Sequence, residues 1–229
     1  TRAVMEPGGA GGTMASALAR LGHDTRIATR VGTGPFSELA LKNAIEAGVS
    51  SDLIQVDEVL QTSSVTILVT PDTQRTMITA IGASRALDAA ELDAGSVEDL
   101  DALVMSAYSL VDGPQRDYAV KALELARAAG ATTFVDMGTG AVNALRDRLI
   151  GLVRKVDYLL MNERELFALT GRQTISEAVS GLASRGIQRL VVKVGEMGSI
   201  VITPEASELI DPYDIDGVVD TTGAGDYYT

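Results

Sequence analysis

The sequence has no cysteine and no tryptophan, and His23 is its only histidine. The lack of cysteine excludes disulfides, thiolate nucleophiles and cysteine-ligated zinc sites, and it suits a protein of the reducing cytoplasm. With one histidine, a Ser-His-Asp triad or a multi-histidine metal site would have to be built around His23. Because His23 follows Gly22 at the predicted end of a helix, we expect a capping or surface role for it instead.

Basic residues are also few. The 19 Lys and Arg stand against 31 Asp and Glu, for a formal net charge of −12. Nucleic-acid binding needs clustered Lys and Arg to neutralise phosphates, so we expect no nucleic-acid partner. No apolar run approaches the roughly 20 residues that span a bilayer, and no basic-then-apolar signal segment begins the sequence. We therefore expect no membrane association either.

What is present is typical of a globular protein: 46% of the 229 residues are apolar and 22% are charged. From residue 100 onward, runs rich in Val, Leu and Ile alternate with amphipathic segments of helical period. The predicted strands are 101–108, 132–137, 156–162, 189–195 and 198–203, and the predicted helices are 114–129, 143–155, 163–171 and 176–186. This alternation predicts an α/β fold with a doubly wound, mostly parallel sheet flanked by helices.

The first hundred residues begin with a glycine loop that leads into a helix. The predicted elements are a helix ending at Gly22, a strand at 25–32 and a helix at 37–48. Residues 61–83 contain two alternating runs joined by Pro71-Asp72-Thr73-Gln74, which predicts a β-hairpin lying partly outside the main core. We expect one domain over residues 1–229, with this hairpin as a protruding β element.

In doubly wound folds, ligands bind at the carboxyl ends of the strands, so loops that follow strands are the first places to search. Four loops stand out: PGGAGGT at 7–13, NERE at 162–165, KVGEMG at 193–198 and DTTGAGD at 220–226.

DTTGAGD places two glycines beside a carboxylate. Gly223 and Gly225 allow strained backbone angles and let a ligand approach the main chain. Successive N–H groups at the mouth of a helix form an anion-binding concavity. Asp226 at its edge is suited to act as a general base that takes a proton from a hydroxyl attacking a phosphoryl group. The alternative is a plain glycine turn with two solvated acids.

The sequence excludes one common nucleotide-binding loop and disfavours a Rossmann oxidoreductase. No Gly-Lys-Ser/Thr occurs, so a Walker-type NTPase is excluded, and Met14 stands where a dinucleotide fingerprint needs its third glycine. Asn162 and Glu165 share one face of a first helical turn; capping is the favoured interpretation, and holding water or Mg²⁺ is the alternative. Lys193 lies in a strand, turn and strand that is by itself an ordinary hairpin, although its side chain could point at a nucleotide.

Together these loops resemble the ribokinase-like, or pfkB, family of sugar and nucleoside kinases. DTTGAGD matches the carboxyl-terminal signature of that family at every defined position, and residues 7–22 resemble its amino-terminal signature. Residues 31–49 resemble the segment that follows, NERE resembles the Asn-x-x-Glu motif, and KVGEMGSIVIT resembles the Lys-x-Gly turn. The motifs occur in the family's order, so the resemblance covers essentially the whole chain.

The resemblance implies ATP-dependent phosphorylation of a hydroxymethyl group, with Mg²⁺ and, as a further candidate, a monovalent cation. It implies that Asp226 is the base and that the N–H groups of Gly223, Ala224 and Gly225 form the anion hole. The implied acceptor-binding residues are Gly8, Gly9, Gly12 and Thr13, and the implied nucleotide-binding residues are Asn162, Lys193, Gly195, Gly198 and Thr221. Glu165 would hold Mg²⁺ through water. The hairpin 61–83 would form a lid that excludes water and pairs two subunits in a homodimer.

The sequence departs from the family pattern at several positions. Thr13 stands where the family usually has Asn, Gly34 replaces an acid and Ser37 replaces a glycine. The family's first strand and its helices after the signature are absent, so we expect a kinase domain that is incomplete at both ends. Two other interpretations stay open: a non-catalytic sugar or nucleoside sensor of the same fold, and a nucleoside or vitamin-precursor kinase. An acidic sugar would call for a basic side chain, for which Arg75 is the candidate.

Overall fold

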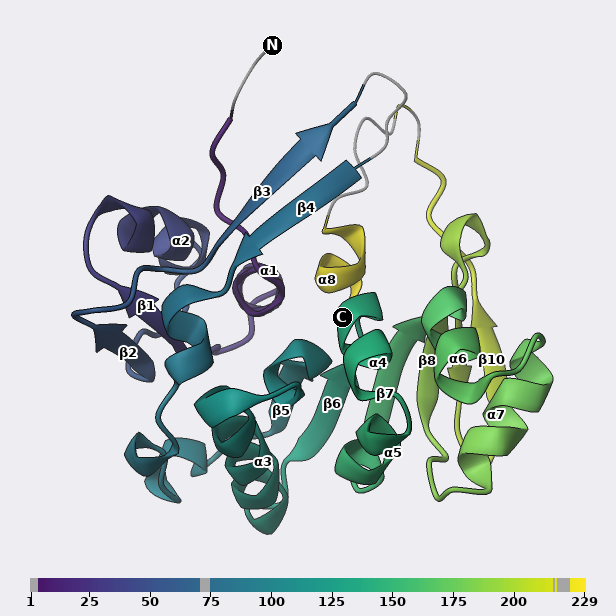
Figure 1. The fold of residues 1–229 in the computed structure, drawn as a ribbon. Helices are drawn as coiled ribbons and strands as arrows, with labels where there is room; N and C mark the ends of the chain where they lie inside the picture. Colours follow the sequence, from purple (N-terminus) through teal and green to yellow (C-terminus); the bar gives the residue numbers. More distant parts are fainter. Residues whose placement is uncertain (1–3, 71–74, 216, 218–222) are drawn as a thin grey trace. The chain divides into compact units, whose positions relative to one another are not determined.

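The computed structural model describes the chain except for residues 1–3, 71–74, 216 and 218–222 (Figure 1). The chain divides into two compact units. The first comprises Thr1–Glu91 with Gly113–Gln115, and the second comprises Leu92–Asp112 with Arg116–Thr229. The residues before the hairpin have a small core of their own, made of Ala15, Ile27, Ala44 and Val49. The single domain over residues 1–229 stays a prediction.

A six-stranded sheet in the order β10-β9-β8-β7-β6-β5 forms the centre of the second unit. Its strands are β5 (Ala102–Ser106), β6 (Thr132–Asp136), β7 (Tyr158–Asn162), β8 (Leu190–Lys193), β9 (Ser199–Ile202) and β10 (Ser207–Ile210). Neighbours from β5 to β8 pair in parallel, whereas β9 and β10 are antiparallel. The predicted α/β fold with a mostly parallel sheet flanked by helices is confirmed. The short edge strand β10, whose four residues are all exposed, was not predicted.

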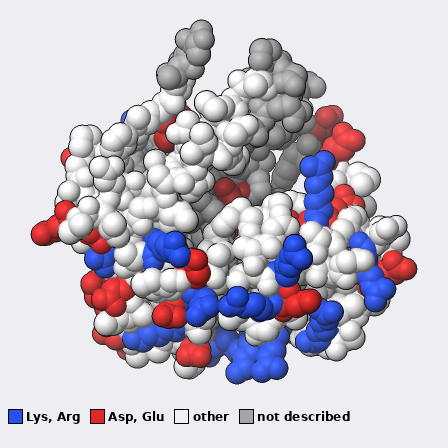
Figure 2. Space-filling model, in the orientation of Figure 1, with Lys and Arg blue, Asp and Glu red and all other residues white. Residues whose placement is uncertain are grey.

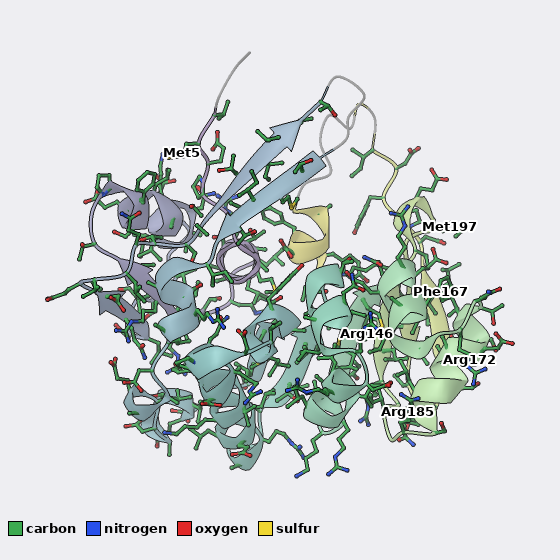
Figure 3. The ribbon with its side chains drawn as sticks, viewed as in Figure 1. Met5, Arg146, Phe167, Arg172, Arg185 and Met197 are labelled. Carbon is green, nitrogen blue, oxygen red and sulfur yellow. The ribbon has the colours of Figure 1, made fainter. Side chains whose placement is uncertain are left out.

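Buried Val, Leu, Met and Ile residues from these strands pack against the helices of the unit. The helices are α3 (Gly113–Ala128), α4 (Thr139–Leu145), α5 (Asp147–Val153), α6 (Glu163–Thr170), α7 (Ile175–Ala183) and α8 (Ala224–Tyr228). The prediction of one helix over 143–155 was wrong, because the chain breaks at Arg146, where φ is 47° (Figure 3). Leu145 of α4 and Leu149 of α5 are both buried in the core.

The first unit contains α1 (Ala10–Arg20), β1 (Thr29–Gly32), α2 (Pro35–Glu46) and β2 (Ile54–Asp57). Strand β2 was not predicted from the sequence. It pairs in parallel with β1, and the Arg30 guanidinium binds the Asp57 carboxylate at 3.0 Å across this pair. Residues 4–9, which precede α1, contain no helix or strand.

The predicted hairpin is confirmed as β3 (Ser64–Val69) paired antiparallel with β4 (Arg75–Ala80). Its predicted turn at 71–74 lies outside the described residues. Every residue of β3 is exposed, and large apolar side chains are exposed on both strands, among them Val65, Ile67, Leu68, Met77 and Ile78.

Within the described part of the chain, no helix has the length and apolar character needed to cross a membrane. Figure 2 shows Lys and Arg side chains interspersed with Asp and Glu over the helices of the second unit that face the viewer.

Candidate active site

Three polar residues end three neighbouring parallel strands of the second unit. Asp136 is the last residue of β6, Asn162 of β7 and Lys193 of β8. Asn162 and Lys193 are direct partners in the β7–β8 register. Since the carboxyl ends of parallel strands meet at one edge of a sheet, these side chains converge at the position where ligands bind in doubly wound folds.

A largely buried ion pair joins two of these strand ends. The Lys193 ammonium lies 2.6 Å from Asp136 Oδ1, and the two side chains are only 15% and 9% exposed. Lys193 also donates to the Gly225 carbonyl and to Thr229 Oγ1, each at 3.4 Å. The pair therefore connects the sheet to α8, the short helix that carries the end of the DTTGAGD signature.

Asp226 lies half-buried in the first turn of α8. Burial raises the pKa of the Asp226 carboxyl above its usual range, and the negative charges of Asp136 and Glu165 raise this pKa further. The Lys193 ammonium acts in the opposite direction and lowers it. A carboxylate with a raised pKa is a stronger base, which suits it to accept a proton from a substrate hydroxyl.

The backbone turns sharply just before Asp226. Gly223 caps α8 in the left-handed conformation, with φ 81°, which favours glycine at this position. Its carbonyl accepts the Tyr227 N–H at 2.9 Å and so closes the first turn. The N–H groups at the start of a helix have no partner within the helix, so those of Ala224 and Gly225 are candidate donors to an anion. Thr221 lies outside the described residues.

Asn162 and Glu165 form the capping box that their spacing predicts. Asn162 Oδ1 accepts the Glu165 N–H at 2.9 Å, and Glu165 Oε2 accepts the Asn162 N–H at 3.0 Å. Glu165 Oε1 accepts from the Thr139 hydroxyl at 2.9 Å. Glu165 is only 6% exposed, and its carboxylate is held by these two donors at the edge where the strands end.

This acidic edge is suited to Mg²⁺ held mainly by water and phosphate. Among the described residues, no group of three His, Cys, Asp or Glu side chains is arranged as a direct metal cage. Mg²⁺ characteristically keeps several waters and uses one or two carboxylates together with substrate phosphates. A carboxylate has about four lone-pair sites, so Glu165 keeps capacity for a metal-bound water beside its two donors.

The two glycines of the KVGEMG turn differ in what they require. A Cβ on Gly198 would lie 2.1 Å from the Ile210 carbonyl oxygen, so only glycine fits between β9 and β10. Gly195 has φ 64°, and a Cβ there would have no atom within 4 Å. Gly198 therefore has a packing role, whereas Gly195 leaves space beside the end of β8.

Comparison with known proteins places this chain in a family. The family model described as pfkB family carbohydrate kinase matches residues 1–229. The chain belongs to the pfkB family. It is therefore a carbohydrate kinase, a phosphotransferase with an alcohol group as acceptor.

Individual members show how close the similarity is. The ribokinase of Staphylococcus aureus (strain COL) is 26% identical over 96% of this chain and 71% of its own length. The adenosine kinase of Sinorhizobium meliloti is 27% identical with a TM-score of 0.89, covering all of this chain and 70% of its own. The fructokinase of Vibrio cholerae O395, at 24% identity and a TM-score of 0.82, covers 97% and 74% and shares the fold.

The candidate acceptor residues of this pfkB kinase lie in the first unit. Gly9 caps α1 with φ 95°, and its carbonyl accepts the Thr13 N–H at 3.0 Å. A Cβ on Gly8, Gly9 or Gly12 would have no atom within 4 Å, so nothing in the packing requires glycine there except the φ of Gly9. The side chain of Arg75 lies outside the described residues.

Two residues of the second unit join the site without having been predicted: Asp136, which pairs with Lys193, and Thr139, which donates to Glu165. The strand-end rule itself points to Asp136, because it closes a correctly predicted strand. Tyr108 packs its ring where a Cβ on Gly138 or Gly140 would lie at 2.7 Å, and its hydroxyl accepts the Gly140 N–H at 3.2 Å. Gly138, which caps α4, and Gly140, in its first turn, are the sequence signal for such a close approach.

Proposed function

We propose that this pfkB kinase transfers the γ-phosphoryl group of ATP to a hydroxyl of a sugar, with Asp226 as the general base. The observation that carries the proposal is the position of Asp226, half-buried in the first turn of α8 directly after the two glycines. The fructokinase of Vibrio cholerae O395 is known in a fructose-, ADP- and calcium-bound form, which supports a sugar acceptor and an adenine nucleotide here.

In the proposed reaction, the acceptor hydroxyl gives its proton to the Asp226 carboxylate while its oxygen forms a bond to the γ-phosphorus. The bond from the γ-phosphorus to the β–γ bridging oxygen breaks, and ADP leaves. The backbone N–H groups of Gly223, Ala224 and Gly225 face the charge on the transferred group. General-base catalysis of this kind contributes roughly 10²–10⁴-fold to the rate.

The nucleotide side of the site is proposed at the ends of β7 and β8. Glu165 and Asn162 would hold Mg²⁺ through water, and the metal would neutralise charge on the phosphates. Gly195 offers a backbone approach beside Lys193, and Thr221 completes the proposed nucleotide contacts. Lys193 itself is already engaged by Asp136 at 2.6 Å, which favours a role other than a direct phosphate contact.

The acceptor side is proposed in the first unit. The loop of Gly8, Gly9, Gly12 and Thr13 would bind the acceptor hydroxyls, and the hairpin β3–β4 would act as the lid. The apolar side chains exposed on this hairpin support its pairing with the same hairpin of a second copy. A nucleoside acceptor is the second candidate, favoured by the similarity to the adenosine kinase of Sinorhizobium meliloti at a TM-score of 0.89.

The test is an ATP-consumption panel of sugars, sugar acids and nucleosides with the wild-type chain and with Asp226→Asn. We expect turnover with at least one acceptor and a loss of roughly 10²–10⁴-fold in kcat for Asp226→Asn, with acceptor binding retained. Asp147→Asn is the matched control, because its side chain is 91% exposed at the start of α5. Full activity of Asp226→Asn would refute the assignment of the base.

A further inference from the structure

Lys193 makes three contacts with the protein. Its ammonium donates to Asp136 Oδ1 on β6, to the Gly225 carbonyl and to Thr229 Oγ1. A lysine has three donors, so these contacts account for its hydrogen-bonding capacity. Two of the three acceptors lie on or next to the helix that carries Asp226.

Helix α8 needs such contacts because it is short. It has five residues, and isolated helices below about 12 residues are marginal in water. Its position therefore depends on contacts with the sheet. One is Lys193 at the end of β8, and the second is the hydrogen bond from the Tyr228 hydroxyl to Ser199 Oγ of β9. The two contacts differ in that only the first brings charge to the site.

Stability alone gives a weak reason for a buried ion pair at this place. Removing two charges from water is costly, and replacing such a pair by apolar residues is often neutral or stabilising. Asp136 and Lys193 are nonetheless both largely buried, and both face Asp226. A role in arranging the reacting groups explains this better than a contribution to stability.

We propose that Lys193 and Asp136 form a positioning pair that fixes the first turn of α8, and with it the Asp226 carboxylate, over the carboxyl ends of β6 and β8. This inference rests on the proposed function, since it assigns the pair to the same general base. Lys193 is thus a positioning residue rather than a nucleotide ligand. The charged groups that face Asp226 are Asp136 from β6, Lys193 from β8 and Glu165 from α6.

The two members of the pair shift the pKa of Asp226 in opposite directions, so variants of each should give opposite results. The charge of Asp136 raises the pKa of Asp226, and the charge of Lys193 lowers it. Asp136→Asn keeps an oxygen acceptor for Lys193 but removes the negative charge, so the Asp226 pKa should fall. Lys193→Met keeps the length of the side chain but removes the positive charge and the contact with Gly225, so the Asp226 pKa should rise.

The experiment is an NMR titration of the Asp226 carboxyl in the full chain, followed by pH profiles of kcat. We expect the titration midpoint to move down in Asp136→Asn and up in Lys193→Met, and the acid limb of kcat to follow. Misplacement of a reacting group by about 1 Å lowers turnover by about 100-fold, so Lys193→Met should lower kcat strongly with little change in the KM for ATP. Lys193→Arg, which keeps the charge, should restore the midpoint toward the wild-type value.

Two controls separate positioning from general loosening. Tyr228→Phe removes the other contact of α8 with the sheet without changing any charge, and Lys155→Met removes an exposed charge just before β7, at the amino-terminal end of the sheet. Neither variant should move the titration midpoint of Asp226 as Asp136→Asn and Lys193→Met do.

Several outcomes would overturn the inference. One is a midpoint that shifts in the same direction in Asp136→Asn and Lys193→Met, and another is a midpoint that moves in neither. A third is a Lys193→Met chain with normal kcat and a raised KM for ATP, which would make Lys193 a nucleotide ligand. Because the titration needs no turnover, an inactive wild-type chain with the expected shifts would refute the proposed function and leave the positioning pair standing.

Discussion

Replacing Glu165 with Ala and with Gln separates its structural role from its proposed role at the metal. In Glu165→Ala, the Asn162 N–H loses its acceptor in a partly buried position, which costs about 1–3 kcal/mol. The hydroxyl of Thr139 is exposed and can hydrogen-bond to water instead, so losing its bond to Glu165 adds little to the cost. With the buried methylenes also removed, the free energy of unfolding should fall by roughly 2–4 kcal/mol.

Glu165→Gln should cost much less. Its amide oxygen can accept the Asn162 N–H, and its NH₂ group can donate to the Thr139 hydroxyl oxygen, so the polar groups stay paired. We expect the free energy of unfolding to fall by about 0.5–1.5 kcal/mol, which is the difference between a charge-assisted and a neutral hydrogen bond. Both variants lack the carboxylate proposed for Mg²⁺, so both should lose most of the activity.

Urea unfolding followed by circular dichroism, with kcat measured at saturating Mg²⁺, checks these values. Glu163→Gln is the matched control, since it removes an acid from the same first turn of α6 without touching the capping box. Equal destabilisation by Gln and Ala would refute the hydrogen-bond argument. Normal activity of Glu165→Gln would refute the metal role.

Three further predictions concern stability. The pKa of Asp226 is raised in the folded state, so between the two pKa values the unfolded chain binds fewer protons than the folded chain, and stability falls as pH rises through that window. Asp226→Asn should therefore be more stable than the wild type at neutral pH, and this gain should vanish at pH values below the ordinary pKa of 3.8. Urea titrations at several pH values would show both effects. Gly198→Ala should lower the thermal midpoint strongly, since its Cβ meets the Ile210 carbonyl and φ is 88°, and an unchanged midpoint would contradict this. Arg146→Gly should instead leave the free energy of unfolding unchanged or raise it by up to about 1–2 kcal/mol. Glycine relieves the backbone strain at φ 47°, and the greater chain entropy of glycine in the unfolded state offsets part of that gain. A lower free energy of unfolding would contradict the strain at this position.

The break at Arg146 illustrates the kind of feature that local sequence patterns do not reveal. The apolar period runs through 143–155, and neither glycine nor proline stands at the break itself, so a continuous helix is the natural prediction. The structure instead places Arg146 at φ 47° between two short helices, whose Leu145 and Leu149 are both buried. Strand β2 is similar: four residues near Ile54 become a strand because β1 offers a parallel partner.

The sequence by itself determined the fold class and the family, because both rest on local patterns: the alternation of apolar strands with amphipathic helices, and contiguous motifs such as DTTGAGD. It also determined the capping box of Asn162 and Glu165, whose partners are three residues apart. Only the tertiary structure decided which groups surround Asp226. Asp136 and Lys193 are 57 residues apart in the chain, and their pairing arises because parallel strands bring their carboxyl ends to one edge of the sheet. No local pattern encodes that contact.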